Sequence, residues 1–199
     1  MALYGIPNIE KFQGMEPLPG YPDINEVLEL QYPGLKDIFD SFYSVLNAQP
    51  NWRDEIMFDR NEFPFEAAIA VPDENGRLIT LAMASNNTRS SRGSLGHAET
   101  EAIFYGLKGE KHLPKGAVLL SSVEPCAMCA TGFHNSGGEK VIFSAFQSDI
   151  RGKSTWVDDM SKPFRSEPES YSAKAFLLER NPAAVVIGGY RRQDALRYM

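Results

Sequence analysis

The chain has 199 residues, of which 43% are hydrophobic and 23% charged, and its formal net charge at pH 7 is −6. This composition is typical of one globular domain, and no apolar run approaches the ~20 residues that cross a bilayer, which argues against a membrane protein. The acidic balance argues against broad nucleic-acid binding, because phosphate contacts need a basic surface.

The first part of the chain predicts an irregular arm followed by helices. Residues 1–22 are rich in proline and glycine and are expected to pack on the surface without regular structure. Asp23 can cap a short helix. Apolar residues over 35–46 then recur at i, i+3, i+4 spacing, which is typical of an amphipathic helix that buries one face. We therefore assign residues 1–50 to an N-terminal arm and helix packed on a domain formed by residues 51–199.

The remaining segments alternate between strands and helices. Two apolar runs, at 66–71 and 77–84, flank a turn cluster and predict a β-hairpin. The segments expected after it are a helix over 97–108, a strand over 117–123, a helix over 126–135, a strand over 141–146, a loop-rich insertion over 149–168, a helix over 171–180, a strand over 183–187 and a short helix in 191–199. This order predicts an α/β fold, a mainly parallel three-layer α/β/α sandwich with a five-stranded mixed sheet led by the hairpin.

The two cysteines of the chain, Cys126 and Cys129, form a single CxxC turn. Such a pair offers no disulfide framework, and the first residues lack the basic flank and apolar core of a signal peptide, so we expect a cytoplasmic protein. A CxxC pair alone can be a redox pair, half of a structural zinc clip or part of a catalytic zinc site. Its neighbours in the sequence are needed to choose among these.

Upstream of the cysteines, His97 and Glu99 form a His-Ala-Glu triplet at the predicted start of a helix. Two thiolates and one imidazole give zinc three protein ligands and leave the fourth tetrahedral position open, as in catalytic zinc sites, where the metal lowers the pKa of a bound water. A structural site would need a fourth ligand, and the chain has no third cysteine. Glu99 has the length and placement to carry the proton of that water.

The combined pattern, HxE followed by PCxxC, resembles that of the cytidine deaminase-like superfamily, in its branch of zinc-dependent nucleobase and tRNA adenosine deaminases. The resemblance covers roughly residues 62–190. It implies the three-layer fold predicted above, Zn²⁺ as cofactor bound by His97, Cys126 and Cys129, and hydrolytic deamination with Glu99 as the catalytic proton carrier. It also implies a homodimer.

Two segments resemble parts of purine deaminases that contact substrate. Asn86, after the second strand, resembles the asparagine that holds the base, because an amide donates and accepts at once. Asn87 is an alternative match, and a plain turn role is the alternative for both. Phe63 begins the segment FPFEA, which resembles the PFGA segment of guanine deaminase-like proteins with Glu66 in place of its glycine. Phe63 would either stack on the base or belong to the core.

The resemblance further implies substrate contacts from the backbone amide of Ala98 and from the carbonyl of Ser122 or Glu124. The Glu124 side chain precedes a proline and alternatively buttresses the loop. Trp156 is a candidate lid, with packing or exposure as its alternative.

The favoured function is zinc-dependent hydrolytic deamination of a small amino-heterocycle, with release of ammonia. Guanine or a related nucleobase or nucleoside is the leading substrate because of the FPFEA segment, Asn86 and the acidic chain. The alternatives are a tRNA adenosine deaminase, which would need a basic groove, a cytosine- or pterin-type amine aminohydrolase, and a deaminase-like scaffold that uses zinc for folding only. A small-molecule substrate and a second copy of the chain are the expected partners, and neither nucleic acid nor a membrane is expected.

Overall fold

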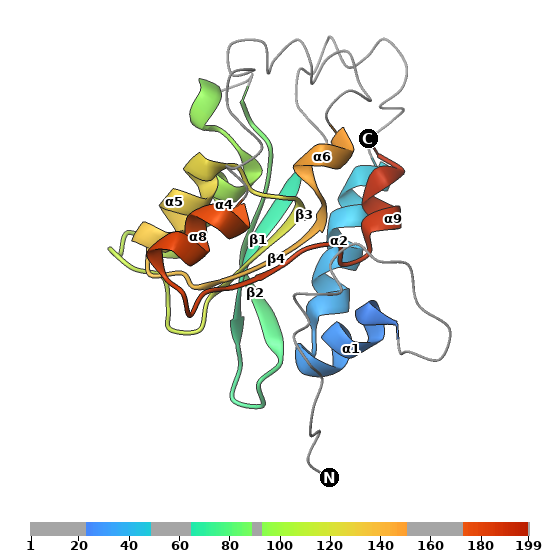
Figure 1. Cartoon of the computed structure of the whole chain (residues 1–199), viewed down its shortest axis with the longest axis horizontal. Helices are drawn as coiled ribbons and strands as arrows, with labels where there is room; N and C mark the ends of the chain where they lie inside the picture. Colours follow the sequence, from blue (N-terminus) through green and yellow to red (C-terminus); the bar gives the residue numbers. More distant parts are fainter. Residues whose placement is uncertain (1–22, 49–64, 89–92, 151–172, 199) are drawn as a thin grey trace.

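The computed structural model describes residues 23–48, 65–88, 93–150 and 173–198 of the chain. Its elements, in chain order, are α1 (Ile24–Gln31), α2 (Leu35–Ala48), β1 (Glu66–Pro72), β2 (Leu78–Ser85), η2 (Gly93–Leu95), α4 (Ala98–Leu107), β3 (Val118–Val123), α5 (Ala127–Asn135), β4 (Lys140–Ala145), α6 (Gln147–Ile150), α8 (Ala173–Arg180), β5 (Val185–Ile187) and α9 (Arg192–Leu196). Figure 1 shows one sheet with helices on both faces, so the predicted α/β/α fold is confirmed.

The sheet has the strand order β2-β1-β3-β4-β5. Strand β1 pairs antiparallel with β2 and with β3, whereas β3, β4 and β5 are parallel to one another. The mixed five-stranded sheet led by a hairpin is therefore as predicted. Because β1 runs opposite to its neighbours, its first residue lies at the same edge as the last residues of β2, β3 and β4. The candidate site is built at this edge.

The helices α1, α2 and α9 cover one face of the sheet (Figure 1). The apolar stripe predicted over 35–46 is buried there at Leu35, Ile38, Phe39, Phe42 and Leu46, whereas its member Val45 is half-buried; Tyr43, which was not predicted to belong to the stripe, is buried as well. The side chain of Asp23 accepts a hydrogen bond from the backbone N–H of Asn25 at 2.9 Å and so caps α1, as predicted. The predicted domain boundary at residue 50 falls in 49–64, outside the described residues, and stays a prediction.

A close approach fixes the connection between α1 and α2 against β2. Leu78 donates its backbone N–H to the carbonyl of Pro33 at 2.6 Å. Gly34 has φ +89°, and a Cβ on this residue would lie 2.3 Å from the carbonyl oxygen of Leu78. Only glycine fits this left-handed, crowded position.

The helices α4, α5 and α8 cover the opposite face (Figure 1). Small residues bring α4 close to the sheet, since a Cβ on Gly106 would lie 3.2 Å from side-chain atoms of both Ile69 and Leu113. Ala98 and Ala102 on the same helix are fully buried in this layer. The start of α4 is therefore held directly over the strands that carry the candidate site.

Two element boundaries differ from the sequence-based expectation. Strand β5 begins only at Val185, because Asn181 accepts hydrogen bonds from the backbone N–H groups of Ala183 and Ala184 and holds them in a turn. Strand β4 ends at Ala145, and the short helix α6, which was not predicted, follows it. The rest of the predicted insertion, 151–168, lies outside the described residues.

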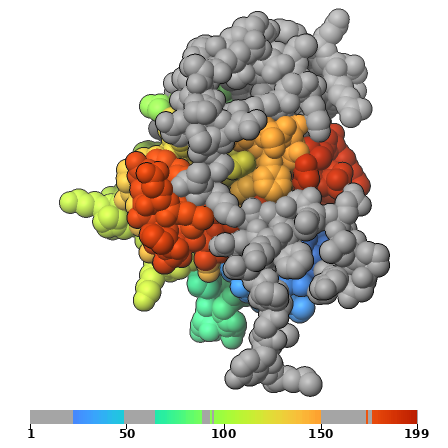
Figure 2. Space-filling model, in the orientation of Figure 1, coloured from blue at the N-terminus to red at the C-terminus, as the bar shows by residue number. Residues whose placement is uncertain are grey.

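An ion pair joins α6 to the last helix of the chain. The Arg192 guanidinium contacts both carboxylate oxygens of Asp149, with its Nε 2.8 Å from Oδ2. Figure 2 shows the segment that ends in α6 (orange) beside α9 (red) on the molecular surface. None of the helices in the described ranges combines the length and the apolar character needed to cross a membrane.

Candidate active site

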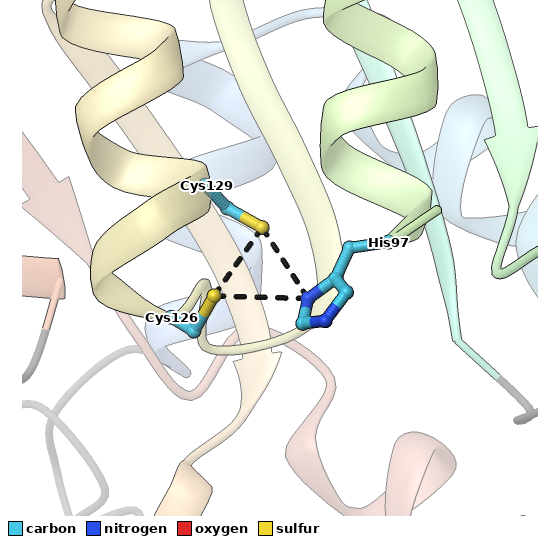
Figure 3. A group of neighbouring side chains, drawn as sticks. All are labelled: His97, Cys126 and Cys129. Atoms are coloured by element: carbon cyan, nitrogen blue, oxygen red, sulfur yellow. Dashed lines mark hydrogen bonds between the residues drawn. The ribbon is translucent and has the colours of Figure 1, made fainter. Parts of the chain in front are cut away.

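Two helix starts meet at the sheet edge described above. His97 is the N-cap residue of α4, and Cys126 is the N-cap residue of α5; both have extended backbone dihedral angles. Serine, threonine, aspartate or asparagine usually occupies this position and accepts a hydrogen bond from its own helix. Here the two side chains point toward each other and toward Cys129, one turn into α5 (Figure 3).

The three donor atoms form a compact triangle. Nδ1 of His97 lies 3.6 Å from Sγ of Cys126 and 3.5 Å from Sγ of Cys129, and the two sulfurs are 3.5 Å apart. In a tetrahedral zinc site, bonds of about 2.3 Å to sulfur and about 2.0 Å to nitrogen separate the donors by about 3.5–3.8 Å. The triangle therefore fits Zn²⁺, and these three residues are the metal-ligand group found among the described residues.

The electrostatics of the triangle favour a cation. The hydrogen bond between the two cysteines, together with the one between Cys126 and His97, lowers the pKa of the Cys126 thiol to about 4, so its sulfur is a thiolate at neutral pH. The same hydrogen bond, followed by burial, raises the pKa of Cys129 well above its usual value. Cys126 and Cys129 would hold a dication as thiolates, so that Cys129 would give up its proton on metal binding, and the dipoles of the two helix starts would stabilise both thiolates.

Glu99 lies beside this triangle in the first turn of α4 and is almost fully buried. Its Oε2 is 3.6 Å from Sγ of Cys129, and its Oε1 is 3.4 Å from Oγ of Ser121. Burial raises the pKa of the Glu99 carboxyl. A buried carboxyl group with a raised pKa is the kind of group that general acid–base catalysis uses.

Asn86, predicted to bind substrate, is buried directly after β2, where its backbone N–H donates to the carbonyl of Phe65. Its Oδ1 accepts hydrogen bonds from the backbone N–H of Thr88 at 3.1 Å and from the Thr88 hydroxyl at 2.8 Å. The turn role weighed in the sequence is thus present in the structure, whereas contact with a base stays a prediction for Asn86 and for Asn87.

Of the other residues predicted to contact substrate, some lie within the described residues and others lie outside them. Ala98 is fully buried at the start of α4, so its backbone amide lies beside His97. The Glu124 carboxylate accepts a hydrogen bond from the backbone N–H of Gln147 at 3.3 Å, which is the buttressing contact considered above. Phe63 and Trp156 lie outside the described residues.

A hollow of about 330 Å³ opens next to this site, between the end of β2 and the outer side of α4. It is lined by Met83, Ala84, Ser85, Asn86, Asn87, Glu101 and Tyr105. Glu101 is two residues after Glu99, so the two side chains leave the helix in different directions. The hollow therefore shares Asn86 with the candidate site and does not contain the metal-ligand triangle.

Sequence reasoning missed two partners of the site. Ser121 and Ser122 are the two polar residues of the otherwise apolar strand β3, and this interruption was the only signal that pointed to Ser121. Gln147 carries no motif. Its side-chain amide donates to the carbonyls of Glu124 at 3.5 Å and Pro125 at 3.3 Å, so it braces the turn before Cys126 from a helix that was not predicted.

Comparison with known proteins agrees with this geometry. Residues 53–145, which include all three ligand residues, match the cytidine and deoxycytidylate deaminase zinc-binding region. A tRNA-specific adenosine deaminase of Rickettsia bellii is 33% identical over 125 residues, covering 59% of this chain and 81% of that protein. A probable cytosine deaminase of Schizosaccharomyces pombe is 27% identical over 138 residues, covering 69% and 78%.

Among solved structures, the chain is similar to a guanine deaminase from Nitrosomonas europaea. The TM-score is 0.54 at 20% sequence identity, over 98% of this chain and 91% of that chain. This likeness supports the shared fold. The three relatives carry different substrates in their names, so they agree on the kind of reaction and differ on the ring that reacts.

Proposed function

Because this chain belongs to the cytidine deaminase-like superfamily of zinc-dependent deaminases, we propose that it removes the amino group of a small heterocycle by hydrolysis, with guanine as the leading substrate. The observation that carries the proposal is the triangle of His97, Cys126 and Cys129 with the buried carboxyl of Glu99 beside it. Three protein donors leave one place of a tetrahedron for a non-protein ligand, which a closed structural site does not.

The three ligand residues would hold Zn²⁺, a Lewis acid that would lower the pKa of a water molecule. Glu99 takes the proton of the attacking water on its carboxylate. It passes this proton to a ring nitrogen of the substrate as the water oxygen bonds to the amino-bearing carbon. It then carries the remaining proton of that oxygen to the amino nitrogen, so that the carbon–nitrogen bond breaks and ammonia leaves. The product keeps the water oxygen as a carbonyl. Burial around Glu99 keeps bulk water away from this transfer.

The choice of guanine rests on sequence resemblance. The FPFEA segment and Asn86 match positions that guanine deaminase-like proteins use, and the net charge of −6 suits a small neutral substrate better than a polyanion. Asn86 lies at the sheet edge that carries the site. A reducing compartment such as the cytoplasm, expected from the cysteine pattern, would keep both thiols available for metal.

A tRNA adenosine deaminase is the second candidate, and the 33% identity to the Rickettsia bellii protein favours it. It predicts a basic rim around the pocket and salt-sensitive binding of tRNA. A cytosine- or pterin-type amine is the third, supported by the Schizosaccharomyces pombe relative. A scaffold that binds zinc without catalysis is the least favoured, because such a protein has no chemical need for a carboxyl at the position of Glu99.

The experiment that tests the proposal measures ammonia release by the zinc-loaded protein from purine bases, nucleosides, cytosine derivatives, pterins and tRNA. Guanine is expected to react fastest, and Glu99→Gln to lower the release by about 10²–10⁴-fold. If ammonia were released fastest from tRNA, and if tRNA binding weakened steeply as the salt concentration rose, the function would be tRNA adenosine deamination and not guanine deamination. No release from any amine would overturn catalysis altogether.

We also propose a homodimer, as expected for this family. Light scattering at working concentration is expected to give twice the mass of the 22.2 kDa chain. A single-chain mass at that concentration would contradict the proposal.

A further inference from the structure

Ser121 is a polar residue set into an apolar layer. It lies on β3, where its cross-strand neighbours are Ala67 on β1 and Phe143 on β4. Both neighbours belong to the core beneath α4 and α5, and Ser121 itself is 1% exposed. A hydroxyl in such a place costs free energy unless it is hydrogen-bonded, so its partners show what it does there.

The hydroxyl of Ser121 has two described partners, which together orient it. Its oxygen accepts from the backbone N–H of Val123 at 3.4 Å, a rigid donor on the same strand. Its hydrogen can then point to Oε1 of Glu99, also at 3.4 Å, where it donates. Hydrogen bonds of catalytic groups are often long in the free enzyme and tighten in the substrate complex, and the bond from Ser121 to Glu99 has this character.

The other oxygen of Glu99 faces a donor that metal binding removes. Oε2 lies 3.6 Å from the thiol of Cys129, which donates to it. A cysteine that binds zinc is a thiolate and has no proton to donate. In the metal-loaded protein, Ser121 therefore becomes the described side-chain donor that restrains the Glu99 carboxylate.

We propose that Ser121 is a positioning residue that holds the Glu99 carboxylate in the orientation from which it exchanges protons with water and substrate. The proposal rests on the deaminase function argued above and deepens it. A glutamate carboxylate, carried on three rotatable bonds, reacts only from a small share of its orientations, and one fixed hydrogen bond raises that share.

The test compares Ser121→Ala, Ser121→Thr and the matched control Ser144→Ala. Ser144 is buried on β4 with its hydroxyl 2.9 Å from the Tyr43 hydroxyl, on the face of the sheet away from the metal-ligand triangle. With the amine that the wild type deaminates fastest, Ser121→Ala is expected to lower kcat about tenfold with KM and zinc content unchanged. Ser121→Thr, which keeps the hydroxyl, is expected to restore most of kcat, and Ser144→Ala to leave it unchanged.

Two further readouts separate positioning from a general packing effect. In a Glu99→Gln background, Ser121→Ala is expected to cause no additional loss, because the group that it orients is gone. A crystal structure of zinc-loaded Ser121→Ala is expected to show the Glu99 carboxylate turned away from its wild-type orientation. An unchanged kcat, or a Glu99 carboxylate that stays in place, overturns the positioning role while the deaminase activity of the wild type stands. A wild type that releases no ammonia from any amine overturns the function itself.

Discussion

His97 and Cys126 occupy equivalent places in the fold, each at the residue where an extended segment turns into a helix, and their Nδ1 and Sγ atoms lie 3.6 Å apart. Because α4 and α5 lie side by side on one face of the sheet, the positive ends of two helix dipoles point at one spot. This arrangement stabilises the Cys126 thiolate before any cation arrives.

His97→Ala is expected to abolish stoichiometric zinc binding, because two sulfurs alone leave half of the tetrahedron without protein donors. Elemental analysis of the purified variant checks this. His112→Ala is the control, since His112 is exposed and lies outside the metal-ligand group, and it should keep full zinc content. Full zinc content in His97→Ala would remove His97 from the ligand set.

Glu99→Gln is expected to keep its zinc and to lose ammonia release by about 10²–10⁴-fold, because an amide cannot carry the proton. The measurement pairs elemental analysis with a steady-state assay on the best substrate of the wild type. Glu110→Gln, at an exposed position beyond the end of α4, should behave as the wild type. Turnover by the Glu99 variant at the wild-type rate would contradict its role as proton carrier.

Glu66→Gln is expected to stabilise the protein more at high pH than at low pH. Glu66 is buried on β1, and burial raises the pKa of its carboxyl from 4.5 to about 7, against the lowering effect of the Ser85 hydrogen bond. The folded wild type therefore holds a proton that the unfolded chain releases. The contribution of Glu66 to stability is fully present below pH 4.5 and is lost as the pH rises to about 7.

The glutamine variant lacks this titration, so its free energy of unfolding relative to the wild type should rise between pH 5 and pH 8 by up to about 3 kcal/mol. Urea unfolding at both pH values measures the difference. A constant difference across this range would show that the Glu66 carboxyl does not keep its proton in the folded protein.

Phe39→Ala is expected to lower the free energy of unfolding by about 3–5 kcal/mol, because it opens a cavity in a fully buried cluster. The Phe39 ring lies 5.0 Å from the Phe42 ring and 4.8 Å from the Tyr190 ring, centroid to centroid, so α2 and the C-terminal end of the chain share this cluster. Thermal unfolding followed by circular dichroism should show one transition at lower temperature. Two separate transitions would show that the N-terminal helices unfold independently of the sheet.

Local patterns were sufficient to predict much of this molecule. The i, i+3, i+4 spacing over 35–46 identified the buried face of α2, and a strand-to-helix transition before Cys126 placed the metal ligands at a helix start. The HxE and PCxxC motifs were sufficient to predict the metal ligands and the catalytic glutamate, because the chemistry of these motifs depends on residue type and short spacing.

Contacts that depend on strand register could not be read in the same way. The pairing of Ser121 with Glu99 requires β3 to lie beneath the first turn of α4, and no spacing in the sequence states that. The Thr88 hydrogen bonds that engage Asn86 and the bracing of Glu124 by Gln147 also arise from tertiary placement. Motif reasoning gave Glu99, Asn86 and Glu124 a chemical role and left their partners open.

The two ends of the described chain hold each other. Asn25 in α1 accepts the backbone N–H of Arg191 at 2.9 Å, and Tyr190 donates to Glu29 at 2.8 Å. A backbone cut within 49–64 would therefore leave two pieces that can stay associated, which makes the chain a candidate for fragment complementation. A fragment limited to residues 53–145 would instead lack α1, α2 and α9, which cover one face of the sheet. Its apolar side chains on that face would then be exposed to solvent.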